Sequence, residues 1–420
     1  MSIENKNWRE QELSLKEVIQ KYPNVSPFVI TKIDVQRRGF VLTPVANEKL
    51  DPDKYLTKQR SIFYEASEKT PAGLLFRDGT SVVGGSMENG GNIDNEREPY
   101  VIDYVDGKFV LTDLGEIIDE VDFWFKPDYY DKVTSKGTPM WRVAVSRPQR
   151  VDFNPNHHCH FWDKPGNGCK YCTIGALSKA DEKANIPTRL DMDDVYETAK
   201  EILKERGHAT NYCLSAGSIL SGKELFDDEV DMYIEILKVI GSLYKVDKFP
   251  SQIVGSAFNL KQLERLYNET GLLSYTTDLE VLDPKLYEWI CPGKTEFVGY
   301  AEWKKRLFDA VSVFGKGYVN TSTVAGVALA KPNGHKSEEE SLKITLAEAE
   351  DISKHGVTVI GSVWRTAPGT IFFKQKTPSL DYYVQLFKGY DDIRRAYGLD
   401  VYFDDYRRCG NHPSTDLSRI

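Results

Sequence analysis

The sequence is poor in cysteine, with six among its 420 residues. So few thiols in so long a chain argue against a disulfide framework, which is typical of short secreted domains. Long apolar runs are absent too, since none approaches the ~20 residues that a membrane-spanning helix needs. Basic residues do not outnumber acidic ones, and the formal net charge of −9 argues against nucleic acid or an anionic membrane as the main partner.

The first ten residues lack the apolar core of a signal peptide. We therefore expect a cytosolic protein with no membrane partner. What is present is an ordinary globular composition, with 40% hydrophobic and 28% charged residues. The length predicts roughly two to three domains and leaves ample chain for a large core.

Half of the cysteines lie in one fourteen-residue window, at Cys159, Cys169 and Cys172. Thiolates are soft ligands for zinc or iron–sulfur clusters, and the C-x2-C spacing of the last two lets both sulfurs point at one metal centre. Gly166 and Gly168 allow the intervening backbone to fold around such a centre. The window therefore predicts a metal or cluster site.

The other three cysteines, Cys213, Cys291 and Cys409, stand singly and tens of residues away. A fourth thiolate is therefore not evident near the motif, and three ligands predict a [4Fe–4S] cluster with one open iron. Two other interpretations stay open. The three cysteines could pack unligated in a core, or they could form a closed structural zinc site with a histidine of the segment 157–160.

With an aromatic residue, Tyr171, directly before the third cysteine, the motif resembles that of the radical S-adenosylmethionine (radical SAM) superfamily. The commonest spacing there is C-x3-C-x2-C, whereas this chain has C-x9-C-x2-C. The resemblance implies a [4Fe–4S] cluster held by Cys159, Cys169 and Cys172, with S-adenosylmethionine (SAM) as second cofactor and Tyr171 beside it. It also implies an electron donor of the flavodoxin or ferredoxin type, and a cysteine loop that follows the first strand of a β/α barrel.

Residues 1–145 are predicted to form an accessory β-rich or α+β domain, in which a helix over 11–22 precedes short β-rich runs separated by turn signals. The predicted strands are 28–35, 39–43, 72–76, 100–104 and 108–112. The glycine-rich residues 84–94 are predicted to be a loop, because they lack the strand-to-helix context of a phosphate-binding loop.

Residues 146–375 alternate strands with helices, and this pattern predicts an α/β fold with a partial or complete TIM-type (β/α) barrel as its core. The predicted strands are 210–215, 251–257, 272–280, 318–327 and 357–363. The predicted helices are 191–205, 227–244, 261–267, 300–314 and 338–355. Residues 376–420 are expected to supply a last helix over 379–397 and a tail that covers the barrel.

Barrel enzymes carry their chemistry at the carboxyl ends of strands, and the resemblance assigns residues there. Ser215 and Gly217 follow the second strand, where radical SAM enzymes have a Gly-Gly-Glu-like turn that grips the methionyl amino group of the cofactor. This copy lacks the acidic residue, and an ordinary tight turn is the alternative. Glu280 matches a carboxylate that contacts the ribose or methionine part of SAM in relatives of biotin synthase, lipoyl synthase and hydrogenase-maturation enzymes. The alternative there is a helix-flanking charge.

The ends of the later strands resemble the same relatives. There Thr321 would contact the cofactor, and Arg365 would bind an anionic group of cofactor or substrate, unless it is a structural ion-pair partner. Near the carboxyl end, Cys409 and His412 could reach over the barrel mouth as a radical relay, a substrate contact or a metal ligand, or could belong to an unremarkable tail. Cys409 and Arg365 are thus the candidate catalytic residues.

The resemblance implies an enzyme that cleaves SAM reductively and lets the resulting 5′-deoxyadenosyl radical abstract hydrogen from a small-molecule or peptide substrate, under anaerobic conditions. A rearrangement, a carbon–carbon bond change or a dehydrogenation in cofactor or natural-product biosynthesis is expected. The isolated cysteines speak against an auxiliary cluster, and no cobalamin-binding domain is recognisable. The alternative is a zinc- or iron–sulfur-bearing binding or electron-transfer protein without SAM chemistry.

Overall fold

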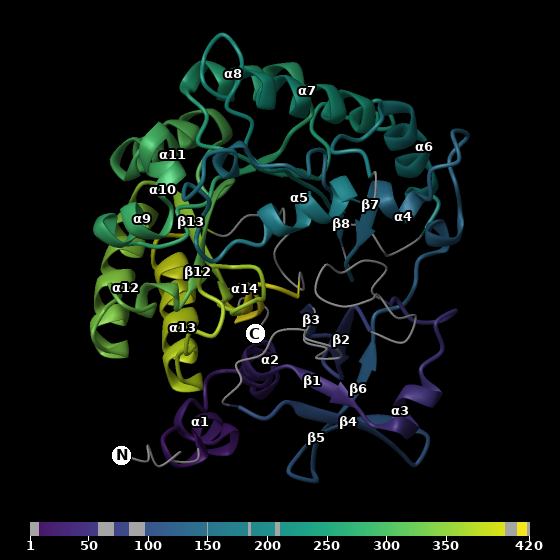
Figure 1. The fold of residues 1–420 in the computed structure, drawn as a ribbon, viewed down its shortest axis with the longest axis vertical. Helices are drawn as coiled ribbons and strands as arrows, with labels where there is room; N and C mark the ends of the chain where they lie inside the picture. The colour runs from purple at the N-terminus through teal and green to yellow at the C-terminus, as the bar shows by residue number, and fades with distance from the viewer. Residues whose placement is uncertain are drawn as a thin grey trace.

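A computed structural model of the protein describes residues 8–57, 71–83, 97–148, 150–183, 186–205, 211–399 and 410–417. The loop predicted over 84–94 and the candidate catalytic Cys409 lie outside these residues. Two β-sheets organise the described chain, one built from its first third and one from the remainder (Figure 1). None of the helices in the described ranges combines the length and the apolarity needed to cross a bilayer.

The larger sheet has seven strands in the order β13-β12-β11-β10-β9-β8-β7. Its strands are β7 (Ala144–Ser146), β8 (Arg150–Phe153), β9 (Asn211–Ser215), β10 (Ser251–Val254), β11 (Ser274–Thr276), β12 (Val319–Ala325) and β13 (Val357–Val363). The strands from β8 to β13 are parallel and pair in chain order, whereas β7 runs antiparallel to β8 at the edge. This open, curled sheet confirms the predicted α/β barrel class in its partial form.

Helices connect these strands and cover the outer face of the curled sheet (Figure 1). They are α5 (Ile174–Lys183), α6 (Met192–Ile202), α7 (Asp227–Gly241), α8 (Leu260–Glu269), α9 (Pro284–Ile290), α10 (Pro292–Phe297), α11 (Tyr300–Phe314), α12 (Glu338–Lys354) and α13 (Leu380–Ala396), with short 3-10 turns η3 (His160–Trp162) and η4 (Val327–Leu329). Local signals start several of them: Asn259 and Gln262 form a capping box at α8, and the Asp191 side chain caps α6. The short helices α9 and α10 escaped prediction because each has a turn or two and too little periodicity.

The smaller sheet has six strands in the order β1-β4-β5-β6-β2-β3 and its own apolar core. Its strands are β1 (Phe40–Leu42), β2 (Gly73–Phe76), β3 (Ser81–Val83), β4 (Tyr100–Val105), β5 (Lys108–Asp113) and β6 (Glu116–Phe123). The helices and turns in the same part of the chain are η1 (Trp8–Glu10), α1 (Leu15–Lys21), α3 (Pro44–Lys49), η2 (Asp128–Asp131) and α4 (Met140–Val143), of which η2 and α4 pack against helix α6 of the barrel. The β-rich texture predicted for this part is therefore present, with β1 parallel to β4 and the other pairs antiparallel.

One predicted strand is wrong, because residues 28–35 belong to helix α2 (Pro27–Arg38). The helix is buried on nearly every side: Val29, Ile30 and Ile33 pack into the core of the barrel, whereas Val35 packs into the core of the smaller sheet. Its polar residues are buried too, with Lys32 paired to Asp416 and Asp34 paired to Arg37, so polar and apolar positions do not separate into an outer and an inner face that would reveal the 3.6-residue period.

The carboxyl-terminal residues 410–417, with α14 (Pro413–Asp416), lie between α2, α13 and β13. Asp416 forms an ion pair with Lys32 of α2, and both side chains are fully buried. His412 is half-buried near Arg150, the first residue of β8, and desolvation together with the nearby cations lowers its pKa to about 3. His412 therefore lies toward the amino-terminal end of β8, and the expectation that it reaches over the barrel mouth is wrong.

Candidate active site

The three clustered cysteines lie on the loop that leaves the carboxyl end of β8, the first parallel strand, as the sequence predicted. All three are free of disulfides; Cys159 and Cys169 are buried and Cys172 is half-buried. Cys159 directly precedes η3, and Cys172 directly precedes the first turn of α5, where the backbone N–H of Ile174 donates to its sulfur at 3.5 Å. Three unbridged thiols at one edge of the barrel fit the donor set of an iron–sulfur cluster.

The nine residues between Cys159 and Cys169 fold around the indole ring of Trp162. A Cβ on Gly168 or Gly175 would lie 2.7 Å or 2.6 Å from atoms of that ring, so glycine is required at both positions. Gly166 adopts φ +86°, a left-handed conformation that glycine accepts at no steric cost. The longer spacing of this motif is therefore filled by a packed aromatic residue.

Burial and neighbouring groups shift the pKa values of the three thiols in different directions. Burial raises the pKa of Cys159 to about 11 and raises the pKa of Cys172 well above its ordinary range. The pKa of Cys169 is lowered, chiefly by a hydrogen bond from Cys291 and in part by the ammonium of Lys294. A bound metal cation would favour the thiolate at all three positions, since metal binding releases thiol protons.

Cys291 and Lys294 were missed as neighbours of the motif. The sequence places Cys291 more than a hundred residues beyond Cys172, and its isolation suggested no role. Only the packing of the α9–α10 junction against the cysteine loop brings it to Cys169.

The turn after β9 packs directly on the cysteine loop. The N–H of Gly217 donates to the carbonyl of Asn156 at 3.0 Å, and the Asn156 side chain donates to the Gly217 carbonyl at 3.1 Å. A Cβ on Gly217 would lie 2.8 Å from the Cα of Cys159. Ser215 is half-buried at the end of β9, at the same edge of the barrel. Gly217 thus packs closely against the cysteine loop, whereas its contact with the ammonium group of a cofactor stays a prediction.

A buried carboxyl group lies behind this turn, where the sequence showed no acidic residue. Glu229 of α7 accepts hydrogen bonds from the N–H of Ile219 at 2.9 Å, from the N–H of Ser256 at 2.9 Å and from the Ser256 hydroxyl at 2.8 Å. Burial raises its pKa to about 7. No sequence signal distinguished Glu229, because acidic residues in the first turn of a helix are common.

Glu280 stands beyond β11 in a left-handed backbone conformation, with φ +70°. For a residue with a side chain this conformation costs of order 1–3 kcal/mol, and such strain gathers at functional sites. The backbone pairs with β12 through the Glu280 N–H to the Ser322 carbonyl at 3.0 Å, and the carboxylate accepts from Lys294 at 2.8 Å. Burial and the charge of Glu280 raise the pKa of the neighbouring Asp278 to about 7.

Three of the predicted site residues remain, namely Tyr171, Thr321 and Arg365. Tyr171 lies close to the cysteines: burial first, and then the charges of Cys169 and Glu280, raise its pKa well above its ordinary range. Thr321 is fully buried and its hydroxyl accepts from the Leu279 N–H at 2.9 Å, so its side chain is engaged within the fold. Arg365 is half-buried just beyond the carboxyl end of β13.

The histidines next to Cys159 do not join the cysteines in the described part of the chain. His158 contacts Asp163 with 2.6 Å between Nε2 and Oδ1, and these two with His160 form a group whose ligand atoms lie within 4.8 Å of one another. However, Nδ1 of His160 accepts the N–H of Leu220 at 3.2 Å, so its other ring nitrogen carries the proton and is not free to ligate. His157 instead contacts Asp181 at 3.2 Å.

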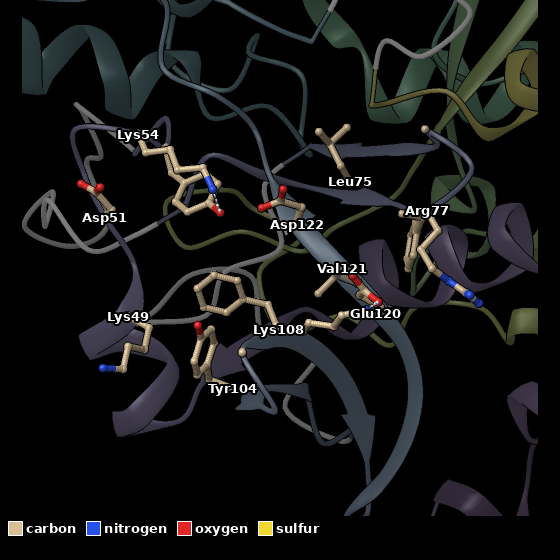
Figure 2. Close-up of a pocket in the computed structure, with 15 residues that line it drawn as sticks. Lys49, Asp51, Lys54, Leu75, Arg77, Tyr104, Lys108, Glu120, Val121 and Asp122 are labelled. Atoms are coloured by element: carbon tan, nitrogen blue, oxygen red, sulfur yellow. Dashed lines mark hydrogen bonds and ion pairs between the residues drawn. The ribbon is translucent and has the colours of Figure 1, made fainter.

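A separate hollow of about 650 Å³ lies on the smaller sheet (Figure 2). Cationic and anionic side chains alternate around it, and several are paired with one another: Lys108 with Glu120 at 2.7 Å, and Lys54 with the Tyr55 hydroxyl at 2.7 Å. Because the lining carries both charges and some of its groups already pair with one another, it favours neither an anionic nor a cationic ligand. No function is therefore assigned to this hollow.

The chain was compared with known proteins, and no family model matches it. A curated relative, the bacteriochlorophyllide c C-7(1)-hydroxylase of Chlorobaculum limnaeum, is 23% identical over 291 residues, which cover 63% of this chain and 64% of the relative. The match therefore spans less than two thirds of the relative's length.

Three solved structures resemble the chain. Methylornithine synthase has a TM-score of 0.40 at 16% identity and covers 62% of this chain and 72% of its own. A radical SAM methyltransferase from Sphaerobacter thermophilus has a TM-score of 0.39 at 14% identity, with 74% and 78% covered. Coproporphyrinogen III oxidase from Escherichia coli, described as a radical SAM enzyme, has a TM-score of 0.37 at 13% identity, with 62% and 55% covered. Two of these three solved structures are thus described as radical SAM enzymes.

Proposed function

We propose that this chain is a radical SAM enzyme that cleaves SAM reductively and abstracts hydrogen from a small-molecule or peptide substrate in cofactor or natural-product biosynthesis. One observation carries the proposal. Three free cysteines share the loop after β8, and the strained, half-buried Glu280 lies near Cys169 at the same edge of the barrel. A structural zinc site or an unligated core would need no such carboxylate.

Each proposed residue has a part that its position supports. Cys159, Cys169 and Cys172 would hold three irons of the cluster, which when bound supplies the electron that breaks a carbon–sulfur bond of SAM. The turn at Ser215 and Gly217 offers backbone carbonyls to an ammonium group.

Other residues would orient the cofactor and the substrate. The carboxylate of Glu280 can accept hydrogen bonds from a ribose diol or an ammonium group. Tyr171 would pack beside the cofactor, and Arg365 would bind an anionic group with its planar guanidinium. Covering helices exclude water and oxygen from the site.

The substrate and the reaction are proposed only as classes. A rearrangement, a carbon–carbon bond change or a dehydrogenation fits hydrogen abstraction. The name of the curated relative adds hydroxylation of a tetrapyrrole to the reactions worth testing. A flavodoxin- or ferredoxin-type protein would deliver the electron.

We propose a matching division of labour along the chain. Residues 146–375 would form the catalytic barrel, 1–145 an accessory domain that supplies specificity or binds a partner, and 376–420 a covering segment. The two separate sheets support this division, and the buried pair of Lys32 and Asp416 links the first part to the last.

The proposal is tested by anaerobic purification and reconstitution, followed by dithionite and SAM and chromatographic detection of 5′-deoxyadenosine. We expect the wild-type protein to bind iron and sulfide and to form 5′-deoxyadenosine, and Cys169→Ala to lose both properties. Cys213→Ala is the matched control, because Cys213 is equally buried but lies on β9 outside the motif. Stoichiometric zinc without 5′-deoxyadenosine would contradict the proposal, and a cluster without SAM cleavage would favour an electron carrier.

A further inference from the structure

The junction between α9 and α10 packs along the cysteine loop. The N–H of Lys170 donates to the carbonyl of Ile290 at 3.0 Å, and the N–H of Gly293 donates to the carbonyl of Asn167 at 2.9 Å. A Cβ on Gly293 would lie 2.7 Å from that Asn167 oxygen, so the two backbones approach as closely as glycine permits. This contact fixes Cys291 and Lys294 beside Cys169.

Lys294 is a buried cation between two acidic residues. Its Nζ donates to the Glu280 carboxylate at 2.8 Å and to the backbone carbonyl of Asp278 at 2.8 Å, and it lies 4.7 Å from the centre of the Trp303 ring. Its residue is 8% exposed. The ion pair with the Glu280 carboxylate at 2.8 Å stabilises the protonated form of Lys294. The ammonium is therefore charged.

We infer that Lys294 is a positioning residue that holds Glu280 toward the cofactor and raises the reduction potential of a cluster bound at Cys169. The inference deepens the proposed function and rests on it. Charge near a cluster and hydrogen bonds to its sulfurs set its potential. Cys291, which the backbone contacts place beside Cys169, would donate a hydrogen bond of that kind from its thiol.

The physical reason is the charge that reduction adds. One electron makes a buried cluster more negative, and a cation held nearby stabilises that reduced state in a medium of low dielectric constant. Without the ammonium, the carboxylate of Glu280 stays near Cys169 with no counter-charge. Reduction then becomes harder, and the strained Glu280 side chain loses the contact that orients it.

Lys294→Met removes the charge and keeps much of the side-chain volume, and Lys294→Arg keeps the charge. Lys304→Met is the matched control, because Lys304 is also ion-paired, with Glu348 at 2.6 Å and Asp351 at 2.7 Å, but on the outer helix α11. Iron and sulfide content are measured first. A redox titration of the reconstituted proteins without SAM, followed by electron paramagnetic resonance, then gives the potential, and equilibrium dialysis gives the Kd for SAM.

We expect Lys294→Met to keep its cluster. At the same applied potential, its ratio of reduced to oxidised cluster should be about tenfold lower than in the wild type, which corresponds to a reduction potential lower by about 59 mV for one electron. SAM should bind about tenfold more weakly. Lys294→Arg and Lys304→Met should stay near wild type, and Glu280→Gln should shift the potential in the opposite direction. Cys291→Ala, which loses only the hydrogen bond, should shift the potential down by less.

A wild-type potential and SAM affinity in Lys294→Met would overturn the inference while leaving the proposed function intact. A wild-type protein that takes up no iron, or forms no 5′-deoxyadenosine, would instead refute the proposed function and the inference with it. If Lys294→Met fails to load iron, the Glu280→Gln and Cys291→Ala titrations decide: unshifted potentials in both would also overturn the inference.

Discussion

Gly217→Ala tests whether the turn after β9 and the cysteine loop form one unit. A Cβ at this position would collide with the carbonyl group of His158, lying 2.5 Å from its carbon, and would lie 2.8 Å from the Cα of Cys159. These are backbone atoms, which cannot swing aside as the end of a side chain can. Either the turn or the loop must therefore move.

The size of the effect follows from what that movement breaks. Overpacking a tight contact costs about 1–3 kcal/mol. The two hydrogen bonds between Gly217 and Asn156, at 3.0 Å and 3.1 Å, contribute about 1 kcal/mol each. We therefore expect a loss of about 3–5 kcal/mol in the free energy of unfolding. Because Cys159 is part of the displaced loop, its sulfur should also leave its place among the three cluster ligands.

The assay compares iron and sulfide per chain after anaerobic reconstitution and the midpoint of thermal unfolding. We expect Gly217→Ala to retain less than about half of the wild-type iron and to melt roughly 3–6 °C below wild type. Gly137→Ala is the control: its φ of +81° costs a side chain about 1 kcal/mol, but nothing lies within 4 Å of the added Cβ. Wild-type iron content and melting temperature in Gly217→Ala would refute the reasoning.

Two further predictions concern buried charges. Because the folded-state pKa of Glu229 is raised to about 7 from its ordinary value of 4.5, the folded protein holds a proton that the unfolded chain releases between these pH values. The contribution of Glu229 to stability is therefore fully present below about pH 4.5 and is lost, by about 3 kcal/mol, as the pH rises to 7. Urea unfolding at several pH values measures this fall in the free energy of unfolding, and Glu229→Gln should remove it. An unchanged pH dependence in the variant would contradict the assignment. Lys32→Met should cost about 3–5 kcal/mol, because it removes the ammonium that pairs with the fully buried Asp416 carboxylate. The double variant Lys32→Met with Asp416→Leu should recover most of that loss, and purely additive losses in chemical unfolding would show that the pair is not coupled.

Several parts of the fold were readable from the sequence because their signals are local. The alternation of strands and amphipathic helices from 210 onward predicted the parallel barrel, and β13 (Val357–Val363) has the predicted bounds. The spacing of Cys159, Cys169 and Cys172 and the adjacent Tyr171 pointed to the cluster and to the radical SAM resemblance. Helix α2 was misread because two cores enclose it and bury its polar residues as well as its apolar ones, so no exposed polar face marks a helical period.

The sequence by itself indicated which chemistry to expect, since the cysteine motif and the alternation of strands and helices can be recognised from neighbouring residues. The tertiary structure alone decided what surrounds that motif. Cys291 and Lys294 reach Cys169, and Glu229 reaches the β9 turn, only when helices distant in the chain pack against the cysteine edge of the barrel. Spacing along a chain constrains contacts within one turn or loop, whereas contacts between distant segments depend on how buried surfaces fit together, which no local pattern encodes.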